Sequence, residues 1–99
     1  MKYTIFWTSN AKITFNQNLE YLSKEWDNKT ILRFLDRVDE VIKNISNNPM
    51  IYPLYRKENA VRKSIINPRI ILYFKVVNNT TIDLLLFWNT HQDMERLHV

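Results

Sequence analysis

The pattern of apolar and polar positions predicts a strand, two helices and three further strands, in that order. Residues 3–8 alternate aromatic and β-branched side chains, which is typical of a short strand. Two stretches follow in which apolar residues recur every three or four positions, as they do on the buried face of an amphipathic helix. The first stripe is Ala11, Phe15, Leu19, Leu22 and Trp26, and the second is Ile31, Phe34, Leu35, Val38, Val41, Ile42 and Ile45.

Capping residues mark where the two predicted helices begin and end. Thr8 or Ser9 can cap the first helix and Asp27 the second, because a side-chain oxygen there accepts from a backbone N–H that has no partner within the helix. Pro49 ends the second helix after Asn47-Asn48, since a residue before proline avoids the helical conformation. The short break at Asp27-Asn28 predicts an antiparallel helix hairpin.

The second half of the chain is predicted to be mostly strand. Residues 50–59 form a loop, and strands follow at 61–66, 69–77 and 81–88. Asn67-Pro68 makes the first turn, and Asn78-Asn79 makes a hairpin turn in which Asn tolerates a positive φ. Residues 89–99 are a tail with one helical turn at 93–97. We therefore expect a single α+β domain over residues 1–99, with the order β-α-α-β-β-β and the helix hairpin on one face of a mainly antiparallel four-stranded sheet.

Alternation along the strands predicts which side chains face the helices. The sets Ile70, Leu72, Phe74 and Ile82, Leu84, Leu86 are expected to form the core under the helix hairpin. Tyr73 and Lys75 then lie on the opposite, free face of the sheet. Arg62 and Lys63 are adjacent and point to opposite faces, and we expect Arg62 on the free face.

Composition removes several classes of chemistry. The 99 residues include no Gly and no Cys, which excludes a Walker A loop, a dinucleotide-binding glycine turn, disulfides and thiolate zinc sites. His91 and His98 are the only imidazoles, so we expect no metal site and no cofactor. The sequence shows neither a membrane-spanning segment nor a signal peptide, and we therefore expect no membrane association and a cytoplasmic location.

Positive charge is concentrated in the middle of the chain. The formal net charge is +4, but residues 50–76 alone carry six basic residues against Glu58, a net of +5. Such a segment attracts phosphates or an acidic partner, although a solvated surface is the alternative. The candidate binding residues for nucleic acid or a protein target are Arg56, Lys57, Arg62, Lys63 and Lys75.

Four motifs in this order resemble those of the RelE/ParE toxins of bacterial type II toxin–antitoxin systems, over nearly the whole chain. They are ISNNP at 45–49, VRKSI at 61–65, LYFKV at 72–76 and FWNTHQD at 87–93. The resemblance implies the expected fold and a toxin, often linked to plasmid stabilisation, that is neutralised by an antitoxin encoded by an adjacent gene. RelE-type toxins cut mRNA on the ribosome, whereas ParE-type toxins inhibit DNA gyrase. The last motif is close to the ParE-like ending and favours that branch.

The RelE branch would require residues that cleave RNA. Cleavage needs activation of a ribose hydroxyl, cations beside the phosphate and an acid for the leaving oxygen. The residues that match are Arg62, Arg69, Tyr73 and His91. However, Ile70 stands where the family usually has an arginine, and His91 replaces the arginine of the ParE-like ending. The sequence therefore leaves open a non-enzymatic toxin, a ribonuclease, a degenerate toxin fold that only binds its partner, and a nucleic-acid-binding module.

Overall fold

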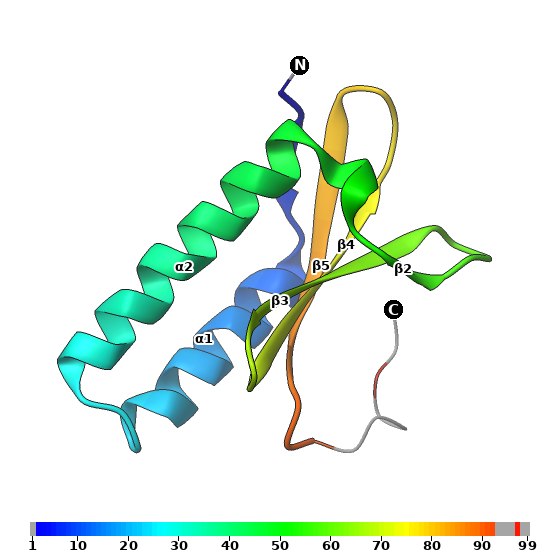
Figure 1. The fold of residues 1–99 in the computed structure, drawn as a ribbon. Helices are drawn as coiled ribbons and strands as arrows, with labels where there is room; N and C mark the ends of the chain where they lie inside the picture. Colours follow the sequence, from blue (N-terminus) through cyan, green and yellow to red (C-terminus); the bar gives the residue numbers. More distant parts are fainter. Residues whose placement is uncertain (1, 93–96, 98–99) are drawn as a thin grey trace.

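A computed structural model describes residues 2–92 and residue 97, and its elements follow the predicted order with two additions (Figure 1). A short 3₁₀ turn and a three-residue strand lie in the segment expected to be a loop. The elements are β1 (Thr4–Trp7), α1 (Ser9–Ser23), α2 (Asn28–Asn47), η1 (Pro49–Ile51), β2 (Leu54–Arg56), β3 (Val61–Asn67), β4 (Ile70–Val76) and β5 (Thr81–Asn89).

The strands form one mixed sheet of five strands in the order β1-β5-β4-β3-β2. β1 runs parallel to β5, and the other neighbours are antiparallel. The α+β class is confirmed, but the predicted count of four strands is wrong. β2 was missed because it spans only three residues, follows Pro53 and pairs with β3 through a bulge at Tyr55, so it has no alternating pattern of its own.

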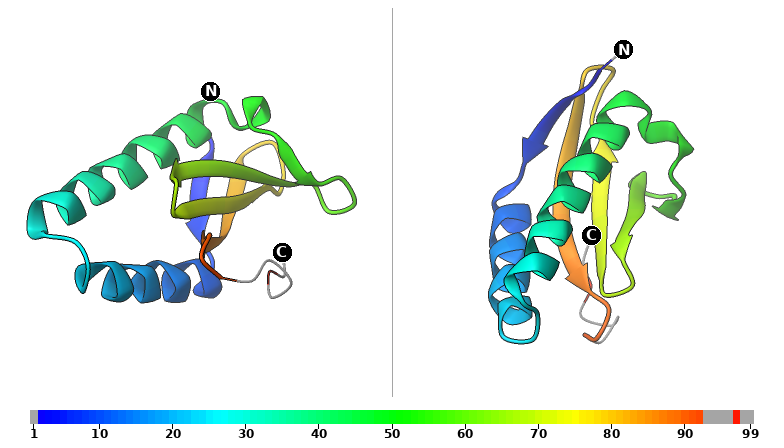
Figure 2. Two further views of the ribbon diagram at one scale, coloured as in Figure 1. Left: turned by 60° about the horizontal axis from the view of Figure 1, so that its bottom comes forward. Right: turned by 60° about the vertical axis from the view of Figure 1, so that its left-hand side comes forward.

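Both predicted helix caps are confirmed. Thr8 Oγ1 accepts from the Ala11 N–H at 3.1 Å, and Asp27 Oδ1 accepts from the Thr30 N–H at 2.8 Å. Hydrogen bonds from the side chain and the backbone of Thr30 lower the pKa of the Asp27 carboxyl below its ordinary value. The nearby Arg33 charge acts in the same direction. The two helices form a hairpin that covers one face of the sheet, as the two views of Figure 2 show.

The main core lies between this hairpin and the sheet. Ile70, Leu72 and Phe74 of β4 and Ile82 and Leu84 of β5 are completely buried there, as the alternation predicted. Aromatic rings from both layers meet in it: Phe15 of α1 lies 5.4 Å from Trp7 and 5.2 Å from Phe87 between ring centroids. Such contacts add to the burial of apolar surface that holds the hairpin on the sheet.

A bulge in β5 changes the face of the residues that follow it. Tyr73 pairs with Leu86 and Phe74 pairs with Leu84, so Leu85 is an extra residue in β5. One extra residue reverses the alternation beyond it. The prediction that Leu86 lies under the helices is therefore wrong: Phe87 takes that place, and Leu86 belongs to a cluster on the other face.

The helix-free face of the sheet carries a second, smaller apolar cluster. Its buried members are Val61, Tyr73, Leu86, Trp88 and Leu97, with Tyr55, Ile71 and Leu85 packed against them. Tyr73 is only 1 % exposed. The expectation that this face is free is therefore wrong at its centre, because the β2 segment and Leu97 cover it.

The turns between the strands differ from the prediction in their backbone conformation. Neither Asn78 nor Asn79 has a positive φ, contrary to the prediction, and Ala60 has a φ of 56° instead. The hairpin turn is stabilised by Asn78 Oδ1, which accepts from the Thr80 N–H at 2.8 Å. The helical turn predicted at 93–97 lies outside the described residues, except for Leu97. Neither α1 nor α2 is long and apolar enough to cross a membrane.

Candidate functional site

Strand register brings three cations onto the helix-free face. Val61 of β3 is opposite Arg56 of β2 on one side and Lys75 of β4 on the other. Lys63 is two residues further along β3 and is opposite Tyr73. Because directly opposite residues share a face, Lys63, Tyr73 and Lys75 lie on one side of the sheet.

Aromatic rings connect the β2 cation to this group. The Arg56 guanidinium lies 5.2 Å from the centroid of the Tyr55 ring, and the Tyr55 and Tyr73 rings meet edge to face with centroids 4.9 Å apart. A guanidinium over an aromatic ring is held by the ring's negative face. We call Tyr55, Arg56, Lys63, Tyr73 and Lys75 the cationic cluster. Tyr55 is not among the residues predicted from the sequence, although its position next to Arg56 is a usable signal.

Tyr73 has a pKa above its ordinary value of 10.0, because burial disfavours the phenolate and the neighbouring Tyr55 adds to the effect. The phenol therefore remains protonated throughout the physiological range. Because Tyr73 is buried, its ring packs beneath the cations, and the phenol is not a base at neutral pH.

Arg62 lies on the opposite side of the sheet from the cationic cluster. It is opposite Phe74, whose side chain is in the core under the helices. Its Nη1 donates to the carbonyl oxygens of Tyr52 at 2.7 Å and Met50 at 3.4 Å. The prediction that Arg62 rather than Lys63 lines the helix-free face is therefore wrong, and its guanidinium holds the η1 segment against the edge of the sheet.

Arg69 and His91 lie together at the far end of β4 and β5. The Thr90 N–H donates to the Arg69 carbonyl oxygen at 2.8 Å, which joins the two segments. The Arg69 side chain forms an ion pair with Glu25 after the end of α1. His91 is exposed, and its backbone N–H donates to Asn89 Oδ1 at 2.9 Å.

Lys57 and Ile70 lie outside the cationic cluster. Lys57 is exposed in the turn between β2 and β3. Ile70, at the position where an arginine was expected, is completely buried in the main core. The structure thus brings Arg56, Lys63 and Lys75 together around the buried Tyr73, but it leaves Arg62, Arg69 and His91 outside this group.

The cationic cluster has the chemistry of a binding surface. It offers Arg56, Lys63 and Lys75, the last of them opposite Asp83 of β5, and the partly exposed Tyr55 ring to an anion, a nucleic acid or an acidic protein segment. Within residues 2–92 and 97, no three His, Asp or Glu side chains come together as metal ligands. Compared with known protein families and with curated proteins, the sequence has no significant match.

Proposed function

We propose that the protein is the toxin of a type II toxin–antitoxin pair and that it inhibits growth by binding its target through the cationic cluster. Support comes from the motif order, from the helix hairpin on one face of the sheet, and above all from the gathering of Arg56, Lys63 and Lys75 around Tyr55 and Tyr73. A cognate antitoxin from an adjacent gene neutralises it with an acidic or apolar segment laid over this face.

Binding is favoured over RNA cleavage because the candidate groups for cleavage are separated. A phosphoryl-transfer site needs cations and a proton donor around one phosphate. Arg62 is committed to the carbonyl oxygens of Met50 and Tyr52. His91 is at the other end of the sheet, beyond Asn89, and Ile70 supplies no charge. The remaining cations attract a polyanion or an acidic surface without providing an acid–base pair.

Among targets, DNA gyrase is favoured by the ParE-like ending at 87–93. Inhibition of translation by ribosome-dependent cleavage of mRNA is the second candidate, and it rests on the shared position of Arg69 and His91 at one end of the sheet. The two candidates differ in what a purified protein does. A gyrase inhibitor stops supercoiling and leaves mRNA whole, whereas a nuclease cuts ribosome-bound mRNA between codons.

A direct test is regulated expression of the full chain with and without the neighbouring reading frame. We expect growth to stop on induction and to recover when the neighbour is co-expressed. Purified protein should then inhibit DNA supercoiling by gyrase while ribosome-programmed mRNA stays intact. Normal growth with soluble, folded protein would contradict the toxin proposal, and codon-boundary cuts would replace gyrase inhibition with the ribonuclease function.

A further inference from the structure

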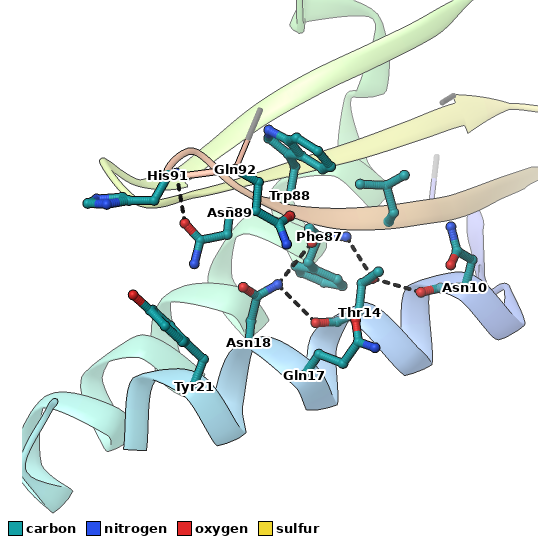
Figure 3. Close-up of a pocket in the computed structure, with 11 residues that line it drawn as sticks. Asn10, Thr14, Gln17, Asn18, Tyr21, Phe87, Trp88, Asn89, His91 and Gln92 are labelled. Atoms are coloured by element: carbon teal, nitrogen blue, oxygen red, sulfur yellow. Dashed lines mark hydrogen bonds between the residues drawn. The ribbon is translucent and has the colours of Figure 1, made fainter. Parts of the chain in front are cut away.

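A second site lies away from the cationic cluster, in a cavity of about 560 Å³ between α1 and the end of β5 (Figure 3). This volume is within the range of small-molecule sites, about 300–1,000 Å³. Its polar lining comes from carboxamides, hydroxyls and an imidazole, and none of the described lining residues is Asp, Glu, Lys or Arg. The polar lining residues include Asn18, Tyr21, Asn89 and His91.

The cavity exists because β5 is longer than β1. β1 ends where Trp7 pairs with Leu84, and β5 continues to Asn89. Side chains of α1 take over the exposed strand edge: Thr14 Oγ1 accepts from the Phe87 N–H at 3.0 Å, and Asn18 Nδ2 donates to the Phe87 carbonyl oxygen at 2.9 Å. Beside these two hydrogen bonds lies a gap that apolar side chains do not fill.

The orientation of the Asn18 carboxamide is fixed by its own hydrogen bonds. Its Nδ2 donates to two carbonyl oxygens, those of Thr14 and Phe87, each at 2.9 Å. Both N–H groups are therefore used, and the amide cannot turn over without losing both bonds. Asn18 Oδ1 remains as an acceptor that faces the cavity (Figure 3) and has no donor among the described residues, on a residue that is 7 % exposed.

Asn89 supplies the complementary group. Its Oδ1 accepts from the His91 N–H at 2.9 Å. In Asn89 the amide oxygen is therefore bonded and the nitrogen is free, the reverse of Asn18. The Nδ2 is left as a donor without an acceptor among the described residues, and Asn89 is also 7 % exposed. In Figure 3 the Asn89 Nδ2 and the Asn18 Oδ1 face the same gap, with Tyr21 and His91 beside it. Both atoms remain accessible from the cavity, so a ligand there can accept from one and donate to the other.

We propose that this cavity binds a nucleobase, either in a free nucleoside or as an unpaired base of a strand. A base edge presents an acceptor and a donor side by side, which is why a carboxamide recognises it with two hydrogen bonds. Here Asn89 Nδ2 donates to the base, and the base donates to Asn18 Oδ1. The Tyr21 and His91 rings offer flat surfaces for stacking. The uncharged lining suits the base and leaves any phosphate outside.

The test is a titration of the full chain with nucleosides, followed by NMR chemical shifts at residues 14–21 and 86–92. At least one nucleoside should bind saturably, and glucose, a neutral polyol that carries no base, should not. Asn89→Asp keeps the oxygen that accepts from His91 but removes the donor, so affinity should fall about tenfold. Asn16→Asp adds the same charge at an exposed position of α1 and should leave affinity unchanged.

A second titration, with single-stranded RNA, identifies the source of the base. If single-stranded RNA binds more tightly than the nucleoside, with the same residues shifted, the base belongs to a strand; equal affinity assigns a free nucleoside. No saturable shift with any nucleoside or strand, equal shifts with glucose, or full binding by Asn89→Asp would overturn the proposal. The growth phenotype does not enter this test, so it stands independently of the toxin proposal.

Discussion

Arg62 in β3 donates a hydrogen bond from Nη1 to the Tyr52 carbonyl oxygen at 2.7 Å. This contact assigns the guanidinium to the helix side of the sheet, where it satisfies a backbone carbonyl of the segment between η1 and β2. The same guanidinium reaches the Met50 carbonyl oxygen. A cation that sequence alone suggested for catalysis is therefore part of the framework that holds β2 in place.

Replacing Arg62 with alanine should lower the free energy of unfolding by about 1 kcal/mol, because a charge-assisted but partly exposed pair of hydrogen bonds is lost. Urea unfolding followed by circular dichroism measures this change. Lys63→Ala, one residue along the same strand, is the control and should change stability less. Equal stability of Arg62→Ala and the parent protein would contradict the structural role.

Introducing an arginine where the resemblance predicts one, as Ile70→Arg, should prevent folding rather than create a nuclease. Ile70 is completely buried in the main core, and an unpaired charge there costs several kcal/mol, on the order of the whole stability of a small domain. The measurement is the near-ultraviolet circular dichroism spectrum, with Ile70→Val as control. A folded Ile70→Arg protein would show that this position is less enclosed than described.

Asn18→Ala should destabilise the protein by about 1–3 kcal/mol, because the buried Phe87 carbonyl oxygen loses its donor at the β5 edge. Asn16→Ala, on the exposed side of α1, is the matched control and should have little effect. Thermal unfolding of both variants compares them directly. Similar midpoints for the two variants would contradict the proposed role of Asn18 in joining α1 to β5.

The lowered pKa of Asp27 predicts that the free energy of unfolding depends on pH. Its folded-state pKa is lowered below 3.8 by the bonds to Thr30, so the folded state favours the carboxylate. The stabilisation is fully present above the ordinary pKa and is lost as the pH falls through the lower folded-state pKa. Asp27→Asn keeps an oxygen to cap α2 but removes the titration, so its stability should fall less than that of the parent between pH 5 and pH 2. Parallel losses in both proteins would exclude Asp27 as the source.

The helices and most strands could be predicted because their patterns extend over many residues. The α2 stripe from Ile31 to Ile45 and the cap at Asp27 are examples. The bulge at Leu85 could not be predicted, because one additional apolar residue in the run Leu84-Leu85-Leu86-Phe87 leaves no mark on the pattern. β2 was hidden for the opposite reason, since three residues are too few to show a period.

The candidate site was predicted in its charges but not in its arrangement. The basic segment 50–76 contains all three cations of the cationic cluster. Alternation alone could not decide whether Arg62 or Lys63 shares a face with Tyr73; the pairing of β3 with β4 decides it for Lys63. Asn18 and Asn89 were missed because their roles depend on hydrogen bonds between segments far apart in the sequence.

We propose above that the cationic cluster inhibits growth by binding a target. The most direct test of this proposal is the growth of cells after induction of the parent chain, a Lys63→Glu/Lys75→Glu variant, and a Lys12→Glu/Lys43→Glu control with the same charge change on exposed helix positions. We predict that the parent and the control stop growth with mRNA intact, and that the cluster variant, folded and equally abundant, permits growth. Normal growth with folded parent protein, or arrest by the cluster variant, would contradict binding through the cationic cluster.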